Sequence, residues 1–407
     1  MAEGESLKAD AVIAGGGPAG MMCGYLLARA GVDVIVLEKH ADFLRDFRGD
    51  TVHPSTLEAL HELGLLQDFL KRPHQEIGKI ELVLGDRHYK AGDFTHLPTV
   101  CKFVAFMPQW DFLDFLAGKA KACPNFRLMM QTEATGLLRD GGRVTGLTAR
   151  TRSGALEIGA ALTLATDGRH SILREAAGFT VNNLGAPMDV LWLKLDPGGA
   201  EEAPAFGRVT GDGILVRFFR GDYWQCAVII RKGSFEAVKA RGLDAFRAIV
   251  ARLAQRDSAD EIEDWDDVKL LTVAVDRLPR WHLPGLLFIG DAAHAMSPIG
   301  GVGVNLAVQD AIAAANILAR PLRERRLRES DLAAVQRRRR FPTWATQAMQ
   351  IAIQNGIIDP VLAAKATPPA PALLKLAQRW PLLRRIPARI VGMGFRPEHP
   401  DLTLFTI

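Results

Sequence analysis

The feature that most constrains this chain is a glycine-rich turn near its beginning. Residues 10–39 read DAVIAGGGPAGMMCGYLLARAGVDVIVLEK. An apolar strand leads into Gly15-x-Gly17-x-x-Gly20, a helix follows as far as Gly31, and a second strand ends at Glu38. This order of strand, turn, helix, strand and acid is typical of a β-α-β unit that binds a dinucleotide.

Each glycine of this turn has a separate physical role. Gly15 allows the tight turn, Gly17 lets a pyrophosphate approach the backbone, and Gly20 lets helix and strand pack closely. The free N–H groups of the first helical turn then face the phosphate charge. Glu38 lies 18 residues beyond Gly20 and is placed to accept hydrogen bonds from ribose hydroxyls. The motif does not distinguish NAD from FAD, and a glycine-rich turn without a ligand is the alternative.

A second glycine-rich segment lies far along the chain. Residues 288–311 read FIGDAAHAMSPIGGVGVNLAVQDA. The sequence predicts a buried strand that stops at Asp291, then glycine and proline residues that interrupt regular structure, and then a helix from about Asn305. Loops at strand carboxyl ends form the ligand crevice of a doubly wound sheet. Pro298, Gly301 and Gly303 give a backbone that can approach a flat ring closely. A helix N-cap aspartate is the alternative for Asp291 alone.

Composition limits the class of protein. The 407 residues suggest two or three domains, the net charge is +4, and the four cysteines form no CxxC pair. We find no apolar run of the roughly 18 residues that a membrane span needs, and no signal peptide at the start. The basic excess gathers between Arg320 and Pro342, without the aromatic or groove-reading elements of a nucleic-acid site. We expect a cytoplasmic, reduced protein whose Arg-rich segment is a solvated or anion-facing helix surface.

Taken together, these motifs resemble the flavoprotein aromatic hydroxylases, the single-component (class A) FAD-dependent monooxygenases typified by p-hydroxybenzoate hydroxylase. The unit ending at Glu38 is similar to their FAD-binding half, and Gly290-Asp291 resembles their GD fingerprint. The segment TLATDGRHSILRE, with Asp167, Gly168, Ser171 and Arg174, resembles their DG fingerprint. The resemblance implies an α/β fold: a doubly wound, Rossmann-like FAD-binding domain, an inserted antiparallel-sheet substrate domain and a helical C-terminal segment.

The resemblance also implies roles for single residues. In the family the GD acid hydrogen-bonds the flavin ribityl chain, which assigns that role to Asp291. Arg48 stands where the family places an arginine near the flavin or its pyrophosphate, although a surface ion pair is the alternative. Gln109 stands where relatives contact FAD at a helix start, and His294 stands where they carry a packing histidine. The implied FAD-binding set is Gly15, Gly17, Pro18, Ala19, Gly20, Glu38, Lys39, Arg48, Gln109, Asp167, Asp291, Pro298, Gly301, Gly303, Val304 and Asn305.

The middle of the chain changes character. Residues 181–275 alternate or run apolar with Gly-Asp turns, and they include a hairpin about Arg220-Gly221-Asp222. Residues 80–94 add strands to the same sheet. The family keeps its substrate sheet here, over the flavin. The candidate pocket residues are Trp192, Arg217, Phe219, Trp224 and Gln225, with an ordinary core position as the alternative for each aromatic.

These patterns predict a discontinuous organisation. The FAD-binding domain takes residues 1–75, 101–180 and 276–320, and the substrate sheet takes 76–100 and 181–275. Residues 321–407 form the helical C-terminal segment, with proline breaks at 321, 342, 368–369 and 371.

The implied reaction uses NADH or NADPH and dioxygen to hydroxylate a phenolic or related aromatic molecule through a flavin hydroperoxide, and FAD carries the chemistry. No catalytic residue is singled out, and no metal site is expected. Further expectations are a monomer or homodimer with no nucleic-acid or membrane partner. A reductase or dehydrogenase without oxygen transfer is the main alternative. A flavin sensor is another, and a halogenase is disfavoured because the WxWxIP motif is absent.

Overall fold

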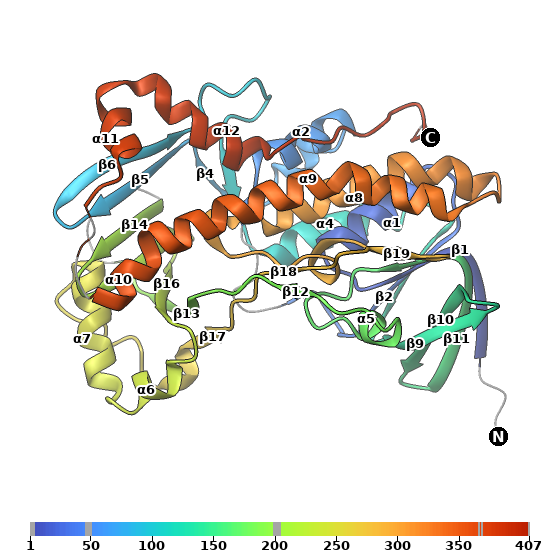
Figure 1. Cartoon of the computed structure of the whole chain (residues 1–407), viewed down its shortest axis with the longest axis horizontal. Coiled ribbons are helices and arrows are strands. Elements are labelled where there is room, and N and C mark those ends of the chain that lie inside the picture. Colours follow the sequence, from blue (N-terminus) through green and yellow to red (C-terminus); the bar gives the residue numbers. More distant parts are fainter. Residues whose placement is uncertain (1–4, 45–50, 198–204, 365–366, 368, 406–407) are drawn as a thin grey trace.

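The computed structural model describes residues 5–44, 51–197, 205–364, 367 and 369–405. Arg48, one of the predicted FAD ligands, lies outside these residues. Two large sheets lie at opposite ends of the molecule, and the long helices α8 (Gly303–Arg323) and α9 (Glu329–Ile353) run between them (Figure 1).

The first sheet has the order β19-β20-β11-β1-β2-β8, with β10 and β9 joined to β11 at one side. The strands β20, β11, β1, β2 and β8 run parallel to one another, and β19 pairs antiparallel at the edge. Its central strands are buried apolar runs, and α1 and α8 contact β1. The strands are β1 (Glu5–Ala14), β2 (Val34–Glu38), β8 (Phe126–Met130), β9 (Glu133–Asp140), β10 (Arg143–Thr151), β11 (Gly154–Ala165), β19 (His282–Leu283) and β20 (Leu286–Phe288).

The second sheet has seven strands in the order β17-β13-β16-β15-β14-β5-β6. It is antiparallel except where β14 meets β5. The predicted hairpin is confirmed, with Phe219 opposite Trp224, and so are the added strands of residues 80–94. The strands are β5 (Lys79–Leu84), β6 (Arg87–Asp93), β13 (Met188–Leu195), β14 (Ala205–Thr210), β15 (Gly213–Phe219), β16 (Trp224–Arg231) and β17 (Lys269–Leu271).

Smaller elements connect the two sheets. A three-stranded sheet has the order β3-β7-β4, and β12 pairs with β18. These strands are β3 (Thr51–Val52), β4 (Gln75–Ile77), β7 (Val104–Phe106), β12 (Asn182–Asn183) and β18 (Asp276–Arg277). The helices before α8 are α1 (Pro18–Arg29), α2 (Pro54–Glu62), α3 (Leu66–Phe69), α4 (Gln109–Ala120), α5 (Ile172–Ala176), α6 (Phe235–Lys239) and α7 (Leu243–Ala254).

The C-terminal part is helical, as predicted, but two of the expected proline breaks are wrong. Pro321 lies inside α8 and Pro342 inside α9. Each proline removes one backbone hydrogen bond. Both prolines are buried, together with Leu322 beside Pro321 and Ala345 one turn beyond Pro342, and this packing offsets the lost bond. Pro371 does precede a helix start. The remaining helices are α10 (Asp359–Ala364), α11 (Ala372–Arg379) and α12 (Arg385–Met393).

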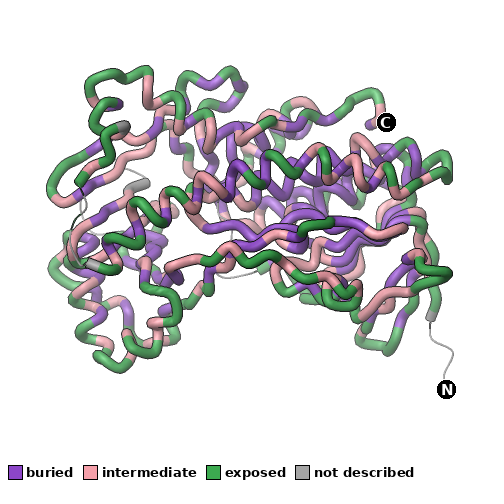
Figure 2. Tube along the Cα trace, in the orientation of Figure 1, coloured by how far each residue is buried: buried purple, intermediate pink, exposed green. Residues whose placement is uncertain are grey.

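The segment Ile299–Arg323 is long and apolar enough to cross a bilayer by length and composition alone, which the sequence reading missed. In the structure 83% of its most apolar window is buried inside the protein. Figure 2 shows this part of the chain among the buried residues at the centre of the molecule. The segment is therefore a core helix between α1 and α9.

Candidate functional site

The glycine-rich turn at Gly15–Gly20 joins β1 to α1. A side chain on Gly15, whose φ is +107°, would collide with the carbonyl of Thr166. A side chain on Gly20 would collide with the carbonyl of Gly15. At Gly17, in contrast, a Cβ would meet nothing within 4 Å, and no side chain caps the helix that begins there. The open space at Gly17 and the free first turn of α1 are what a bound pyrophosphate requires.

The Glu38 carboxylate lies beside this turn, at the end of β2. Its Oε2 accepts a hydrogen bond from the Gly16 N–H at 3.1 Å, and its Oε1 accepts one from the His40 N–H at 3.0 Å. Each carboxylate oxygen can accept more than one hydrogen bond. Glu38 is therefore held in place by the backbone and can still accept from ribose hydroxyls. Lys39 follows it and is exposed.

The DG segment packs against the same turn, with Asp167 next to Gly15. The Asp167 Oδ2 accepts from the Leu173 N–H at 3.2 Å, at the start of α5. Its Oδ1 is buried and has no hydrogen-bond partner among the described residues. Burial raises the pKa of Asp167, and hydrogen bonds from Ser171 and the Leu173 N–H oppose that shift. The Asp167 Oδ2 therefore holds the loop that carries it.

The GD segment forms a short 3₁₀ turn, Gly290–Ala292, directly after β20. The Asp291 carboxylate is partly exposed, and Arg169 of the DG segment approaches it at 3.5 Å. Arg174 Nη1 donates to the carbonyl of Ala292 at 3.1 Å. A Cβ on Gly290 would lie 3.1 Å from the Cβ of Ala19 in α1. The three fingerprints, which are far apart in sequence, therefore meet at one place.

The glycine-rich loop before α8 is held by a segment that the sequence reading did not single out. The carbonyl of Gly301 accepts from Thr51 Oγ1 at 2.8 Å and lies 3.1 Å from His53 Nε2. The amide oxygen of Asn305 accepts from Ser55 at 2.8 Å and Thr56 at 2.6 Å. Burial lowers the pKa of His53 to about 4, so the imidazole is neutral at physiological pH. These partners are about 250 residues away, which local patterns do not reveal.

Three other residues of this loop, and Gln109 of α4, remain predicted FAD contacts. Helix α8 begins at Gly303, two residues before the expected start. A Cβ on Gly303 would meet nothing within 4 Å. Pro298 precedes the turn, and Val304 is buried in the first turn of α8. Gln109 is the first residue of α4 and is partly buried.

Part of the Arg-rich segment is buried, contrary to the expectation of a solvated or anion-facing surface. Arg339, in α9, is 1% exposed and donates to Asp310 at 2.8 Å and to Glu398 at 3.1 Å. Its charge can be buried because two carboxylates neutralise it. His294 Nε2 reaches the same Asp310 at 2.6 Å, so His294 is hydrogen-bonded and not merely packed.

Three of the predicted pocket residues lie on the face of the seven-stranded sheet that packs against α7. Trp224, 5% exposed, packs in the cluster formed with Phe246 and Val250 of α7. Phe219 contacts Trp224 at 5.0 Å between ring centroids. Arg217 lies 4.8 Å from the same ring and donates to Ala254 at the end of α7. Side chains alternate between the two faces of a strand, and these three face α7.

The opposite face of this sheet packs toward the loop before α8. Trp192 belongs to a cluster that contacts Ile299 and Ile358. Phe218 contacts Phe106 of β7 at 4.7 Å between centroids. Gln225 pairs across the hairpin with Phe218, and Arg220 Nε donates to its side-chain oxygen at 2.9 Å. Trp192 and Gln225 therefore lie on the face toward the loop before α8, and Phe218, which the sequence did not single out, lies on the same face.

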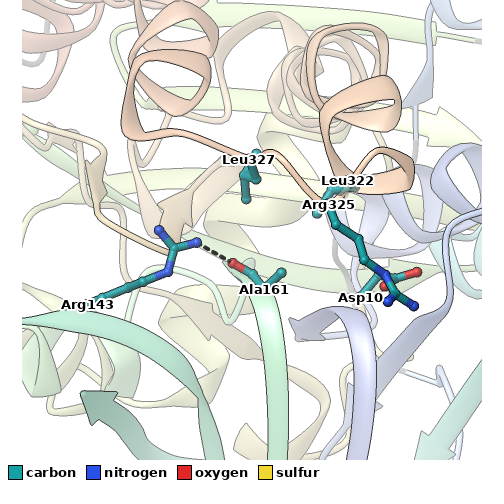
Figure 3. Close-up of a pocket in the computed structure, with 6 residues that line it drawn as sticks. All are labelled: Asp10, Arg143, Ala161, Leu322, Arg325 and Leu327. Atoms are coloured by element: carbon teal, nitrogen blue, oxygen red, sulfur yellow. Dashed lines mark hydrogen bonds between the residues drawn. The ribbon is translucent and has the colours of Figure 1, made fainter. Parts of the chain in front are cut away.

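A cavity of about 300 Å³ is lined by six residues, which Figure 3 draws: Asp10, Arg143, Ala161, Leu322, Arg325 and Leu327. Arg143 donates to the carbonyl of Ala161 at 3.2 Å. Leu322 lies in the last turn of α8 and Arg325 just after that helix ends, whereas Gly303 lies at its start. A helix of this length spans about 30 Å. This cavity is therefore separate from the place where the three fingerprints meet.

The residues present fit FAD. Two uncapped helix starts with open glycine backbone, at Gly17 and Gly303, can face a pyrophosphate and a flat ring, respectively. The carboxylates of Glu38 and Asp291 can accept hydrogen bonds, as the hydroxyls of a ribose and a ribityl chain require. Among the described residues there is no group of three or more histidine, cysteine or acidic side chains that could hold a metal ion.

Comparisons with known proteins agree with this site. The model of a family described as an FAD binding domain matches residues 8–349. A 6-methylpretetramide 4-monooxygenase of Streptomyces rimosus is 32% identical over 387 residues, which cover 94% of this chain and 91% of that protein. Two solved structures share the fold. The OxyS anhydrotetracycline hydroxylase from Streptomyces rimosus has a TM-score of 0.75 at 23% identity, and the match covers 95% of this chain and 76% of that one. The p-nitrophenol 4-monooxygenase PnpA from Pseudomonas putida DLL-E4 has a TM-score of 0.74 at 20% identity, covering 98% and 96%.

The predicted resemblance, the fold class and the cofactor are all confirmed. Since the family model covers most of the chain and a relative matches nearly its whole length, this chain belongs to the FAD-binding-domain family and is an FAD-dependent aromatic monooxygenase.

Proposed function

We propose that this enzyme hydroxylates a polycyclic phenolic aromatic of the polyketide type. One observation carries the proposal: the 32% identity with the 6-methylpretetramide 4-monooxygenase extends over nearly the full length of both chains. A match that includes the seven-stranded sheet, and not only the FAD-binding motifs, supports a similar class of substrate. When bound, FAD would supply the redox chemistry, which takes a hydride from NADH or NADPH and transfers one atom of dioxygen to the substrate while the other leaves as water.

The chain's own residues would hold the cofactor and orient it. We assign the pyrophosphate to the start of α1 at Gly17, with Pro18, Ala19 and Gly20, and the adenosine ribose to Glu38. We assign the ribityl chain to Asp291 and the flavin ring to the loop Pro298–Asn305, where the start of α8 favours negative charge on the reduced ring. Lys39, Arg48, Gln109 and Asp167 remain proposed contributors.

The face of the seven-stranded sheet that packs toward the loop before α8 would form the roof over the substrate. Its partly buried aromatic side chains, Trp192 and Phe218, offer flat apolar surfaces for a fused ring system. The linked side chains of Gln225 and Arg220 offer hydrogen bonds to phenol or carbonyl oxygens. A roof of this kind excludes water from the oxygen-transfer step.

The remaining expectations belong to this proposal. It assigns residues 1–75, 101–180 and 276–320 to the FAD-binding domain, 76–100 and 181–275 to the substrate sheet, and 321–407 to the helical C-terminal segment. It takes the enzyme to be a cytoplasmic monomer or homodimer that needs neither nucleic acid nor a membrane.

The test is a coupled assay of the FAD-loaded enzyme with NADH and with NADPH. A tetracyclic phenol should raise the rate of nicotinamide oxidation severalfold and should gain one ¹⁸O atom from ¹⁸O₂. A single-ring phenol serves as the comparison, and equal stimulation by it would contradict the polycyclic assignment. Reduction of an alkene or quinone without oxygen incorporation would instead support a reductase.

A further inference from the structure

A buried network of charges lies directly behind the GD turn. Asp310, in α8, is 0% exposed, and its neighbours Arg339 and His294 are each 1% exposed. Glu398, near the C-terminus, is 5% exposed and pairs with both Arg339 and Arg338. Burying so many charges is costly unless each is paired and hydrogen-bonded. The role of the network therefore depends on which parts of the chain its paired side chains hold in place.

One carboxylate oxygen of Asp310 reaches both sides of the turn that carries Asp291. Oδ2 accepts from the Gly290 N–H at 3.2 Å and lies 2.6 Å from His294 Nε2. Because a carboxylate only accepts, this ring nitrogen carries the hydrogen. The N–H groups of Ala293 and His294 both donate to the Gly290 carbonyl at 2.9 Å. Asp310 therefore anchors Gly290, which precedes Asp291, and His294, which follows it by three residues.

The other members of the network hold Asp310 itself. Arg339 Nε donates to its second oxygen, Oδ1, at 2.8 Å. Burial raises the pKa of Asp310, but His294 and Arg339 overcome this and hold it below its ordinary value. Asp310 therefore stays ionised, which keeps both oxygens available as acceptors. Trp281, itself buried, covers the His294 ring at 4.9 Å between centroids.

We propose that Asp310 is a positioning residue for FAD: it acts through the Gly290 N–H and His294 to hold the Asp291 carboxylate where the ribityl chain needs it. This inference rests on the proposed role of Asp291. Asp310 does not touch the cofactor in this scheme. Its contribution to FAD affinity should therefore exist only while Asp291 is present, whereas a merely structural residue would weaken binding in either background.

The test is a double-mutant cycle on FAD binding to the full chain. The dissociation constant of FAD is measured for the wild type, Asp291→Ala, Asp310→Asn and the double variant, together with the urea midpoint of each apoprotein. Asp310→Asn should weaken binding by on the order of tenfold when Asp291 is present, and by less than about twofold in the Asp291→Ala background. Equal losses in both backgrounds would overturn the inference.

Two further variants keep the test decisive. Glu398→Gln disturbs the same charges without touching the turn, and it reaches Asp310 only through Arg339, so its coupling to Asp291 should be clearly smaller than that of Asp310→Asn. Coupling of Glu398→Gln to Asp291 as large as that of Asp310→Asn would overturn the inference. Should Asp310→Asn fail to fold, His294→Ala removes the other contact to the turn and should show the same dependence on Asp291. If Asp291→Ala alone leaves FAD affinity unchanged, the proposed role of Asp291 fails and the inference falls with it.

Discussion

The hydroxyl of Thr51 donates a hydrogen bond of 2.8 Å to the carbonyl of Gly301, a residue 250 positions later in the chain. The same carbonyl lies 3.1 Å from His53 Nε2. Gly301 has a φ of +63°, and a side chain there would collide with Thr51. The segment between β2 and α2 therefore fixes the backbone of the proposed flavin loop.

His53 makes these contacts to the Gly301 carbonyl, which we call the clamp, sensitive to pH. Burial lowers its pKa from 6.5 to about 4, so the unfolded chain takes up a proton at a higher pH than the folded protein does. Stability is then present above pH 6.5 and is lost as the pH falls toward 4. Between pH 7 and pH 5 the loss from this one group is about 2 kcal/mol. Urea unfolding at a series of pH values measures it.

The matched variants for this prediction are His53→Gln and His61→Gln. Glutamine at position 53 can still donate to the Gly301 carbonyl but does not titrate, so the free energy of unfolding of His53→Gln should fall less between pH 7 and pH 5. His61 is exposed at the end of α2, and its replacement should leave the wild-type profile unchanged. Equal pH profiles for wild type and His53→Gln would contradict the assignment.

The glycines of the first turn should separate binding from folding. Gly17→Val should fold, because a Cβ there meets nothing within 4 Å, but it should lose FAD because the side chain fills the space of the pyrophosphate. Gly20→Ala should destabilise the apoprotein itself, because its Cβ would collide with the carbonyl of Gly15. Bound flavin after gel filtration and the thermal midpoint of the apoprotein distinguish the two outcomes. Retention of FAD by Gly17→Val would contradict the assignment.

The sequence could predict what depends on local chemistry. The turn at Gly15, the acid at Glu38 and the turn at Asp291 are each recognised from glycines or an acid next to a strand and a helix in the sequence. Such a motif therefore predicts both its own conformation and the elements beside it. The clamp from Thr51 to Gly301 and the pair of Asp310 with Arg339 depend on chain segments that approach only in the folded protein. Similarly, alternation along β15 and β16 predicts two faces of a sheet without saying which one faces the flavin loop.

Asp291 should contribute directly to FAD affinity. Its carboxylate is partly exposed beside Arg169, and in the proposed scheme it accepts hydrogen bonds from ribityl hydroxyls. Asp291→Ala should remove a charge-assisted hydrogen bond worth on the order of 1.5–3 kcal/mol, or roughly a ten- to hundredfold loss of affinity. Quenching of FAD fluorescence during titration of the apoprotein measures it. Asp291→Asn, which keeps one acceptor oxygen, should retain part of the affinity.

The two faces of the substrate sheet should respond differently to truncation. Trp224 packs against α7, and its indole N–H donates to the Pro197 carbonyl at 3.2 Å. Trp224→Ala should lower the free energy of unfolding by about 3–5 kcal/mol because it leaves a cavity in that cluster. At a temperature where the variant stays folded, the fraction of NAD(P)H that ends as hydrogen peroxide should match the wild type.

Phe218 is the matched position on the other face, one residue away from Phe219 and in contact with Phe106. Phe218→Ala should raise the peroxide fraction, because a loosened roof admits water to the oxygen-transfer step. Its thermal midpoint should fall less than that of Trp224→Ala, since Phe218 is only partly buried. Nicotinamide oxidation, peroxide and hydroxylated product are measured together for both variants. If Trp224→Ala uncouples the reaction and Phe218→Ala does not, the assignment of the two faces is reversed.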